Sequence, residues 1–165
     1  MFTIPDFNTI TEEFERRNNI IKKHDKIPIK DPLYLEFICT YKSIELNADI
    51  ELFEYDLCLR ENKYIKESYN ALSDKVWIIG RSGQGDEWFI DIKNNQILFY
   101  DHNKGEYERS LFANLEIDFV RFIQMGTVIK QMEKYIEEGE EVTEEFIKIM
   151  NTISPNLFNK YPYKY

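Results

Sequence analysis

Two segments of alternating apolar and polar residues, EWFIDI and ILFYDH, constrain the fold more than any other part of the sequence. Alternation with a period of two is typical of β-strands. Between the segments lie Asn94 and Asn95, and asparagine tolerates the positive φ that a two-residue type I′ turn requires. The pattern therefore predicts a β-hairpin. Its register, counted outward from the turn, pairs Ile92 with Ile97, Ile90 with Phe99, and Trp88 with Asp101.

The two faces of this hairpin differ in composition. One face is nearly all apolar, so we expect helices to pack against it; it carries Trp88, Ile90, Ile92, Ile97, Phe99 and Asp101. The other face is mixed, so we expect it to be half covered; it carries Phe89, Asp91, Leu98 and Tyr100.

Helical signals precede the hairpin. Residues 9–12, with the sequence TITE, have the form of a capping box and predict a first helix over about residues 10–22. Asp31 followed by Pro32 predicts the start of a second helix, because a proline at the first helical position loses no hydrogen bond.

Helical periodicity returns after the hairpin. Gly139 is expected to end one helix and Thr143 to begin the next. The apolar stripe of the first of these helices consists of Leu115, Phe119, Phe122, Gly126, Ile129, Met132 and Ile136. Short apolar runs at residues 50–53 and 76–79 predict further strands. This order of elements predicts an α+β fold, with a central antiparallel or mixed β-sheet flanked by N-terminal and C-terminal helices.

Length and composition predict a single domain over residues 1–165. Of the 165 residues, 43% are hydrophobic, and neither a linker nor a repeat divides the chain. No secretory signal and no membrane-spanning run is visible, so we expect a cytoplasmic protein. Cys39 and Cys58 fit neither a disulfide framework nor a metal-ligand spacing, and we expect both to be reduced core residues.

The charge of the chain is acidic and unevenly distributed. The formal net charge is -9, and residues 106–145 carry 11 acidic against 4 basic residues. Residues 146–165 contain three lysines and no acid. An acidic surface repels nucleic acid and favours basic partners. The alternative is a set of solvated helix faces that charge keeps soluble.

The stretch VWIIGRSGQGDEWFID contains three glycines, Gly80, Gly83 and Gly85, and therefore has some likeness to a phosphate-binding loop. Such a loop needs Lys-Ser or Lys-Thr and then a helix whose N-terminus faces the phosphate. Here two acids, Asp86 and Glu87, follow instead and lead into a strand. Carboxylates at that position repel phosphate, so we expect a turn between two strands.

Metal binding and catalysis are poorly supported. Asp86, Glu87, Asp91, Asp101 and His102 are potential ligands close in sequence, but the hairpin places Glu87 and Asp91 on the opposite face from Trp88. His24 and His102 are the two histidines of the chain, and neither has an obvious nucleophile beside it. We therefore expect no metal, no cofactor and no enzymatic activity.

Several short motifs together resemble the SUKH superfamily. They are WIIG at residues 77–80, GQGDEWFID at 83–91, ILFYDH at 97–102 and FVRFI at 119–123, preceded by IP at 27–28 and YLEFICTY at 34–41. This superfamily includes the yeast cell-wall-assembly regulator and many bacterial immunity proteins of polymorphic toxin systems. The resemblance covers about residues 10–126 and leaves residues 127–165 as a C-terminal helical extension.

The resemblance implies an α+β fold around a central antiparallel sheet and a binding role without catalysis. The motif residues are expected to form the scaffold, not the binding surface. They are Gly80, Gly83, Gly85, Asp86, Trp88, Asp101 and His102.

The function implied is that of an immunity protein, which binds and neutralises a cognate polymorphic toxin by protein–protein contact. Nuclease domains are frequent toxins and present a basic groove that an acidic protein can occupy. Each acidic residue can equally well be an ordinary solvated side chain. The candidate toxin-binding residues are Glu106, Glu108, Glu137, Glu138, Glu140 and Glu141.

The alternative is an intracellular regulatory or scaffold module that binds a cellular protein or peptide. Its contact surface would be the mixed hairpin face or the aromatic tail, which contains Phe158, Tyr161, Tyr163 and Tyr165. Under either hypothesis the partner is a protein, not a nucleic acid or a membrane. We expect a monomer or a weak dimer.

Overall fold

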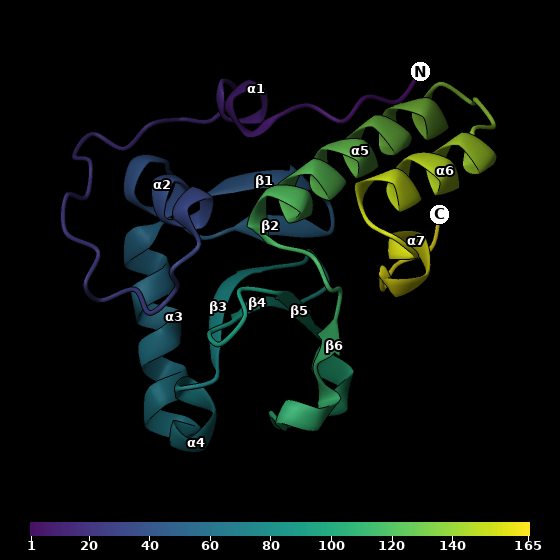
Figure 1. The fold of residues 1–165 in the computed structure, drawn as a ribbon. Helices are drawn as coiled ribbons and strands as arrows, with labels where there is room; N and C mark the ends of the chain where they lie inside the picture. Colours follow the sequence, from purple (N-terminus) through teal and green to yellow (C-terminus); the bar gives the residue numbers. More distant parts are fainter.

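A six-stranded antiparallel sheet forms the centre of the protein in the computed structural model, which describes residues 1–165 (Figure 1). Every strand pairs with its neighbour in sequence. The strands are β1 (Ile44–Asn47), β2 (Ile50–Leu52), β3 (Val76–Arg81), β4 (Glu87–Asp91), β5 (Ile97–Tyr100) and β6 (Ala113–Asn114). Helices lie before, between and after these strands, so the predicted α+β fold with a central antiparallel sheet is confirmed.

The β4–β5 hairpin exists, but its predicted register is wrong. Ile90 lies opposite Ile97 and Trp88 opposite Phe99, two residues away from the predicted pairing. The turn is longer than predicted because the Asp91 carboxylate accepts the N–H of Lys93 at 2.9 Å and ends the strand early. A shift of two residues leaves the side chains within the two strands on their predicted faces, whereas Ile92 and Asp101 lie outside the strands.

The apolar face of the hairpin packs against a helix, as expected. Trp88, Ile90 and Ile97 are fully buried, and the Trp88 ring lies 5.0 Å from the ring of Phe122, centroid to centroid. Phe122 belongs to the long helix α5 (Phe119–Glu137), which crosses this side of the sheet (Figure 1).

The opposite face is fully covered, so the expectation of half coverage is wrong. Phe89, Leu98 and Tyr100 are no more than 1% exposed. The chain that follows β5 folds back under the sheet and places Phe112 against the rings of Phe89 and Tyr100, at 4.9 and 4.8 Å between centroids. This returning segment contains two short 3-10 helices, η1 (His102–Lys104) and η2 (Arg109–Leu111).

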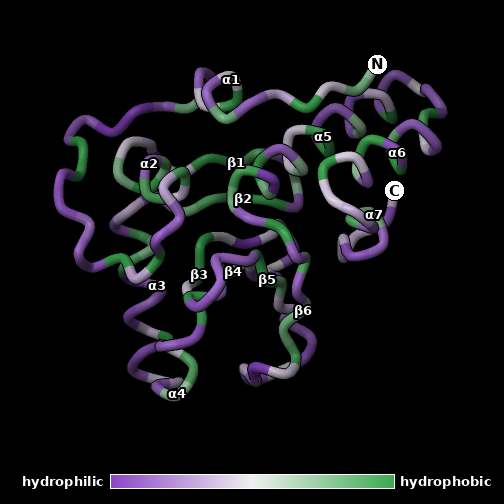
Figure 2. Tube along the Cα trace, in the orientation of Figure 1, coloured by the Kyte–Doolittle hydropathy of each residue, from purple (hydrophilic) through white to green (hydrophobic).

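The other helices are short, apart from α3 and α6. None of the helices is both long enough and apolar enough to cross a bilayer. Figure 2 shows hydrophobic residues along the strands and mostly hydrophilic ones over the outer turns. The remaining helices are α1 (Phe7–Thr11), α2 (Pro32–Thr40), α3 (Tyr55–Ser68), α4 (Asn70–Ser73), α6 (Thr143–Ile153) and α7 (Leu157–Lys160).

Three predicted helix boundaries are confirmed. The Asp31 carboxylate accepts the N–H groups of Leu33 and Tyr34 and caps α2. Gly139, at a φ of 76°, follows the end of α5, and α6 begins at Thr143. The stripe predicted for this helix is buried as far as Met132, whereas Ile136 is 49% exposed. The predicted start at Leu115 is wrong, because α5 begins at Phe119 after the Asp118 carboxylate caps it.

The predicted helix over residues 10–22 is wrong. The first helix is capped by Asp6 and ends at Thr11. The chain beyond it hydrogen-bonds to the end of α2, with the Arg17 N–H donating to the Thr40 carbonyl at 2.8 Å. These tertiary hydrogen bonds replace the i to i−4 bonds that a longer helix would have made.

Helix α3 was not predicted, and it covers the edge of the sheet. Strand β2 pairs with β3 only at Gly80 and Arg81, which leaves the first half of β3 without a strand partner on that side. The buried Asn62 of α3 fills the gap: its amide donates to the Ile78 carbonyl at 3.0 Å and accepts the Ile78 N–H at 3.0 Å. A side-chain amide thus substitutes for a strand.

Both cysteines are free and buried, as predicted. Cys58 of α3 also contacts this edge, with its thiol 3.1 Å from the Ile78 carbonyl.

Candidate functional site

The glycine-rich loop is a tight connection between β3 and β4. The Ser82 N–H donates to the Asp86 carbonyl at 2.8 Å, and Gly85 adopts a φ of 91°. Gly80 is required for a different reason: a Cβ at this position would lie 2.2 Å from the Glu51 carbonyl oxygen of β2. The loop is therefore a turn between strands, as the sequence predicted.

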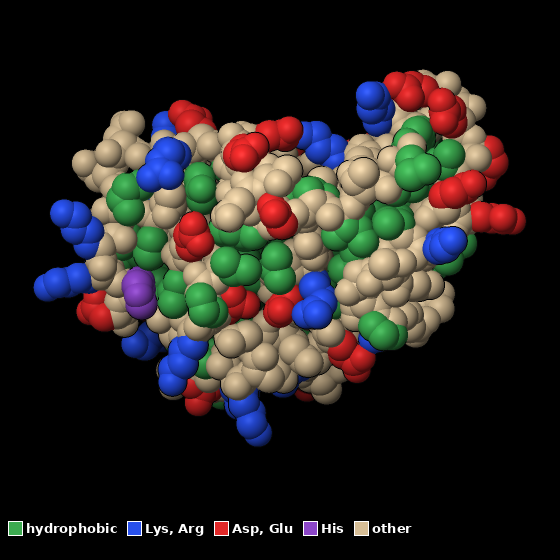
Figure 3. Space-filling view, turned by 45° about the horizontal axis from the view of Figure 1, so that its top comes forward, with side chains coloured by type: hydrophobic (Ala, Val, Ile, Leu, Met, Phe, Trp, Pro, Cys, Tyr) green, Lys and Arg blue, Asp and Glu red, His purple; other side chains and the backbone are tan.

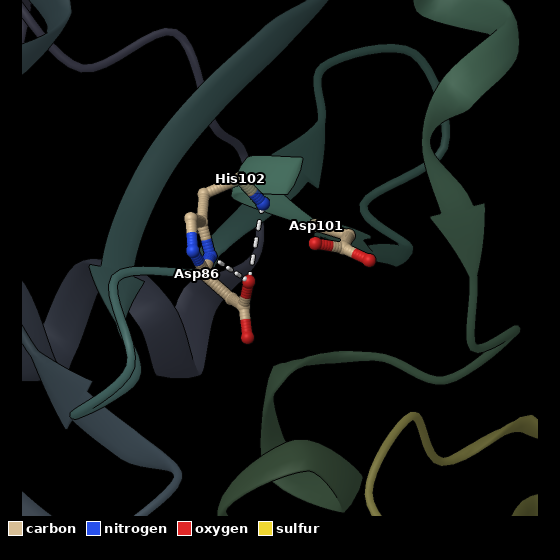
Figure 4. Close-up of side chains that lie close together, drawn as sticks. All are labelled: Asp86, Asp101 and His102. Atoms are coloured by element: carbon tan, nitrogen blue, oxygen red, sulfur yellow. Dashed lines mark hydrogen bonds and ion pairs between the residues drawn. The ribbon is translucent and has the colours of Figure 1, made fainter. Parts of the chain in front are cut away.

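Asp86 holds this loop to the end of β5 (Figure 4). One oxygen accepts the His102 N–H at 3.1 Å and lies 2.6 Å from His102 Nδ1. The other accepts the Tyr163 hydroxyl and lies 3.5 Å from Ser82 Oγ. Burial acts to raise the pKa of Asp86, but the hydrogen bonds from Tyr163 and His102 outweigh it and hold that pKa below its usual value. Asp86 is thus stabilised as a carboxylate.

The neighbouring acid, Glu87, has the opposite environment. It lies on the other face of β4, where burial raises its pKa and the hydroxyl of Tyr107, which donates to it, opposes that rise. Two consecutive carboxyl groups therefore differ in pKa because they lie on different faces of the sheet.

Asp86, Asp101 and His102 are the residues that could hold a cation. Their potential ligand atoms all lie within 4.8 Å of one another. Each of the acids already has a structural task, since Asp101 accepts the Asn103 N–H at 2.9 Å and caps η1. A cation would have to displace the hydrogen bonds that Tyr163 and His102 donate to Asp86.

Tyrosines of the C-terminal tail donate hydrogen bonds to buried carboxylates at and beside this cluster. The sequence did not predict these bonds. Tyr161 and Tyr165 both donate to the carboxylate of Asp49, in the turn between β1 and β2, and Tyr163 donates to Asp86. Burial and the charge of Asp49 raise the pKa of Tyr161. Alternate tyrosines of the sequence YPYKY, in a segment that bends at residues 161–163, thus reach two buried carboxylates.

The seven motif residues lie together around this loop. The Trp88 indole N–H donates to the Asp49 carbonyl at 2.8 Å, and the Gly83 N–H donates to the Ala48 carbonyl at 3.0 Å. The contacts of Gly80, Asp86, Asp101 and His102 are likewise made within the fold.

The six glutamates predicted to bind a toxin are all exposed, but they do not form one surface. Glu106 and Glu108 lie in the segment beneath the sheet. The other four lie at the opposite end of the molecule, around the turn between α5 and α6 (Figure 1). Among these four, only Glu138 has an ion-pair partner, Lys134 at 3.8 Å.

The surfaces suggested for the regulatory alternative are covered or partly buried. The mixed hairpin face is fully covered, as described above. In the tail, Tyr161 is 1% exposed, and Phe158, Tyr163 and Tyr165 are partly buried against the core. These side chains contribute to the fold and do not form an exposed aromatic surface.

Comparisons with protein-family models, with curated proteins and with solved structures each found no match. The geometry and charge of the chain, together with the motif resemblance, therefore carry the functional proposal.

Proposed function

We propose that the protein is a SUKH-like immunity protein of the cytoplasm, which binds and neutralises a cognate toxin domain by protein–protein contact. The observation that carries the proposal is the concentration of exposed carboxylates at the α5–α6 turn in a chain of net charge -9. The motif residues, in contrast, are engaged in internal hydrogen bonds, which leaves the outer surface to select the partner.

A basic toxin surface explains this charge. A nuclease domain binds phosphates with lysine and arginine side chains, and exposed carboxylates compete for the same groups. Opposite charges also accelerate association, and that acceleration falls as salt screens the charges. A rapid inhibitor is useful to a cell that makes its own toxin.

The test is protection of living cells. We expect cells that express the toxin-like protein encoded next to this chain to grow only when this chain is expressed with it. The two purified proteins should form a complex whose association slows by about tenfold or more between about 0.05 M and about 0.5 M salt. The absence of protection, together with no complex at low salt, would contradict the proposal.

A further inference from the structure

A groove opens at the end of the molecule where the N-terminal segment meets α5 and α6. Its volume is about 510 Å³, and five of its nine lining residues are hydrophobic. The apolar lining includes Phe2, Tyr135, Val142 and Ile149. Cavities of this size accept one or more large side chains of a ligand.

Hydrogen bonds hold the walls of the groove in place. The N-terminal segment is fixed to α5 by Gln131, whose side chain accepts the Thr3 N–H and donates to the Thr3 carbonyl, both at 2.9 Å. The ring of Phe2 lies between the helices, with centroids 5.1 Å from Tyr135 and 5.8 Å from Phe146. A groove with fixed walls loses little conformational entropy when a partner binds.

The turn that forms one end of the groove is also well defined. The Glu140 N–H donates to the Tyr135 carbonyl at 2.9 Å, and the Gly139 N–H donates to the Ile136 carbonyl at 3.0 Å. This pair of bonds is the Schellman motif, which fixes the direction of the chain after α5. Glu140 is thereby held at the rim.

Acidic side chains surround the apolar lining. Glu140 and Glu145 belong to the groove itself, against a single lysine, Lys148. Glu137, Glu138, Glu141 and Glu144 are exposed nearby in sequence. Figure 3 shows acidic side chains gathered around apolar ones at this end of the molecule.

We propose that the groove binds an amphipathic, basic segment of the toxin, with a large apolar side chain in the groove and lysine or arginine residues against the rim. The apolar lining supplies the anchor site and the carboxylates select the charge of the partner. A nucleic acid or an anionic lipid surface would be repelled by the same rim. This inference rests on the proposed function and assigns its binding surface to the α5–α6 end, not to Glu106 and Glu108.

A defined peptide tests the groove without knowledge of the toxin. The probe is a synthetic amphipathic peptide of about 14 residues, with leucine and tryptophan on one face and lysine on the other. Added to the full-length, ¹⁵N-labelled protein, it should shift the amide signals of Phe2, Tyr135, Val142 and Ile149. The same peptide with glutamate in place of lysine should not bind. Signals that shift mainly outside the groove would overturn the proposal.

Two double substitutions that change the net charge equally distinguish the effect of charges at the groove from the effect of the net charge of the whole protein. Glu140→Lys with Glu145→Lys should weaken peptide binding by about tenfold or more, because both carboxylates lie at the groove. Glu106→Lys with Glu108→Lys alters the net charge equally at the other end and should weaken binding by less than about threefold. Equal losses in the two variants would contradict a local site.

A variant without any charge change tests the apolar part. Thr152 is exposed and lines the groove, so Thr152→Trp should fill it and abolish peptide binding while the circular dichroism spectrum stays unchanged. A dimer of the unmodified protein that this variant dissociates would instead identify a second copy of the chain as the occupant, and would overturn the proposal.

The toxin experiment separates this inference from the proposed function. If the Glu140→Lys, Glu145→Lys variant no longer protects cells and the Glu106→Lys, Glu108→Lys variant still does, both are supported. If both variants protect equally, the immunity function stands and the groove is not its binding surface. If the peptide binds in the groove but the unmodified chain protects against no neighbouring toxin, the groove is a binding site and the proposed function is wrong.

Discussion

Carboxylates have opposite roles at and beside the β3–β4 loop, where Asp49 and Asp86 are buried, and at the α5–α6 end of the molecule. At the loop, the carboxylates of Asp49 and Asp86 are buried, and tyrosine hydroxyls of the tail donate to both. At the α5–α6 end, the carboxylates of Glu140 and Glu145 are exposed and line an apolar groove.

The difference shows where recognition can occur on this molecule. A buried carboxylate whose oxygens already accept hydrogen bonds stabilises the fold, and a partner could reach it only by displacing those donors. An exposed carboxylate keeps its oxygens available to a partner. The motif that resembles a family therefore surrounds the β3–β4 loop, whereas the surface proposed to bind lies at the α5–α6 turn.

The largest effect on the loop is expected from Gly80→Ala. The new Cβ would lie 2.2 Å from the Glu51 carbonyl oxygen, so β2 and β3 would have to separate. We expect a loss of about 3 kcal/mol in the free energy of unfolding, measured by denaturant titration.

Gly85→Ala is the matched control, because nothing lies within 4 Å of its added Cβ and only the φ of 91° is unfavourable. Its cost should be about 1 to 2 kcal/mol. If Gly80→Ala costs no more than this control, the close approach of the two strands is not a constraint on the loop.

A smaller loss is expected when Asp86 is changed to Ala. Tyr163 and Ser82 would lose their partner at a buried position, and we expect the free energy of unfolding to fall by about 2 kcal/mol. Asp101→Ala removes only the cap of a 3-10 turn and should cost less than about 1 kcal/mol.

The pH dependence gives this prediction a second readout. Because the pKa of Asp86 is lowered in the folded protein, its stabilising effect is fully present above the unfolded value of about 4 and is lost as the pH falls through the folded value. The stability difference between the unmodified protein and Asp86→Ala should therefore be constant above about pH 5 and shrink in more acidic solution. A difference that grows as the pH falls would rule out the carboxylate as its source.

Local patterns predicted the parts of the fold that local interactions determine. Alternation placed the residues within β4 and β5 on their correct faces, and Asp31 with Pro32 located the start of α2. The register goes with a turn that is closed by hydrogen bonds from the Lys93 N–H to the Asp91 carboxylate, from the Asn95 N–H to the Asp91 carbonyl and from the Gln96 N–H to Asn94 Oδ1. Alternation does not reveal these bonds. The helix predicted over residues 10–22 does not form, because the chain there hydrogen-bonds to the end of α2. A local sequence pattern does not reveal such contacts with a distant segment.

Helix α3 has a helical pattern of buried residues in its sequence, but a polar residue within that pattern made it difficult to recognise. Its buried residues are Tyr55, Cys58, Asn62 and Ile65, which recur at helical spacing. A polar Asn62 interrupts this stripe because its amide completes the edge of the sheet. At the candidate site, the sequence located the acidic residues at the α5–α6 turn but not the groove, since Phe2 reaches it from the far end of the chain.

The smallest effect on stability is expected at the α5–α6 end, where Glu140→Lys with Glu145→Lys should change the free energy of unfolding by less than about 0.5 kcal/mol. Two small contributions oppose each other there. Lysine relieves repulsion among neighbouring glutamates, but in the first turn of α6 it is unfavourable beside the positive end of the helix dipole. Denaturant titration of this variant, with Glu106→Lys, Glu108→Lys as the control of equal charge, measures the balance. A loss of about 2 kcal/mol or more would mean that these glutamates stabilise the fold as Asp49 and Asp86 do, and the contrast between the β3–β4 loop and the α5–α6 end would no longer hold.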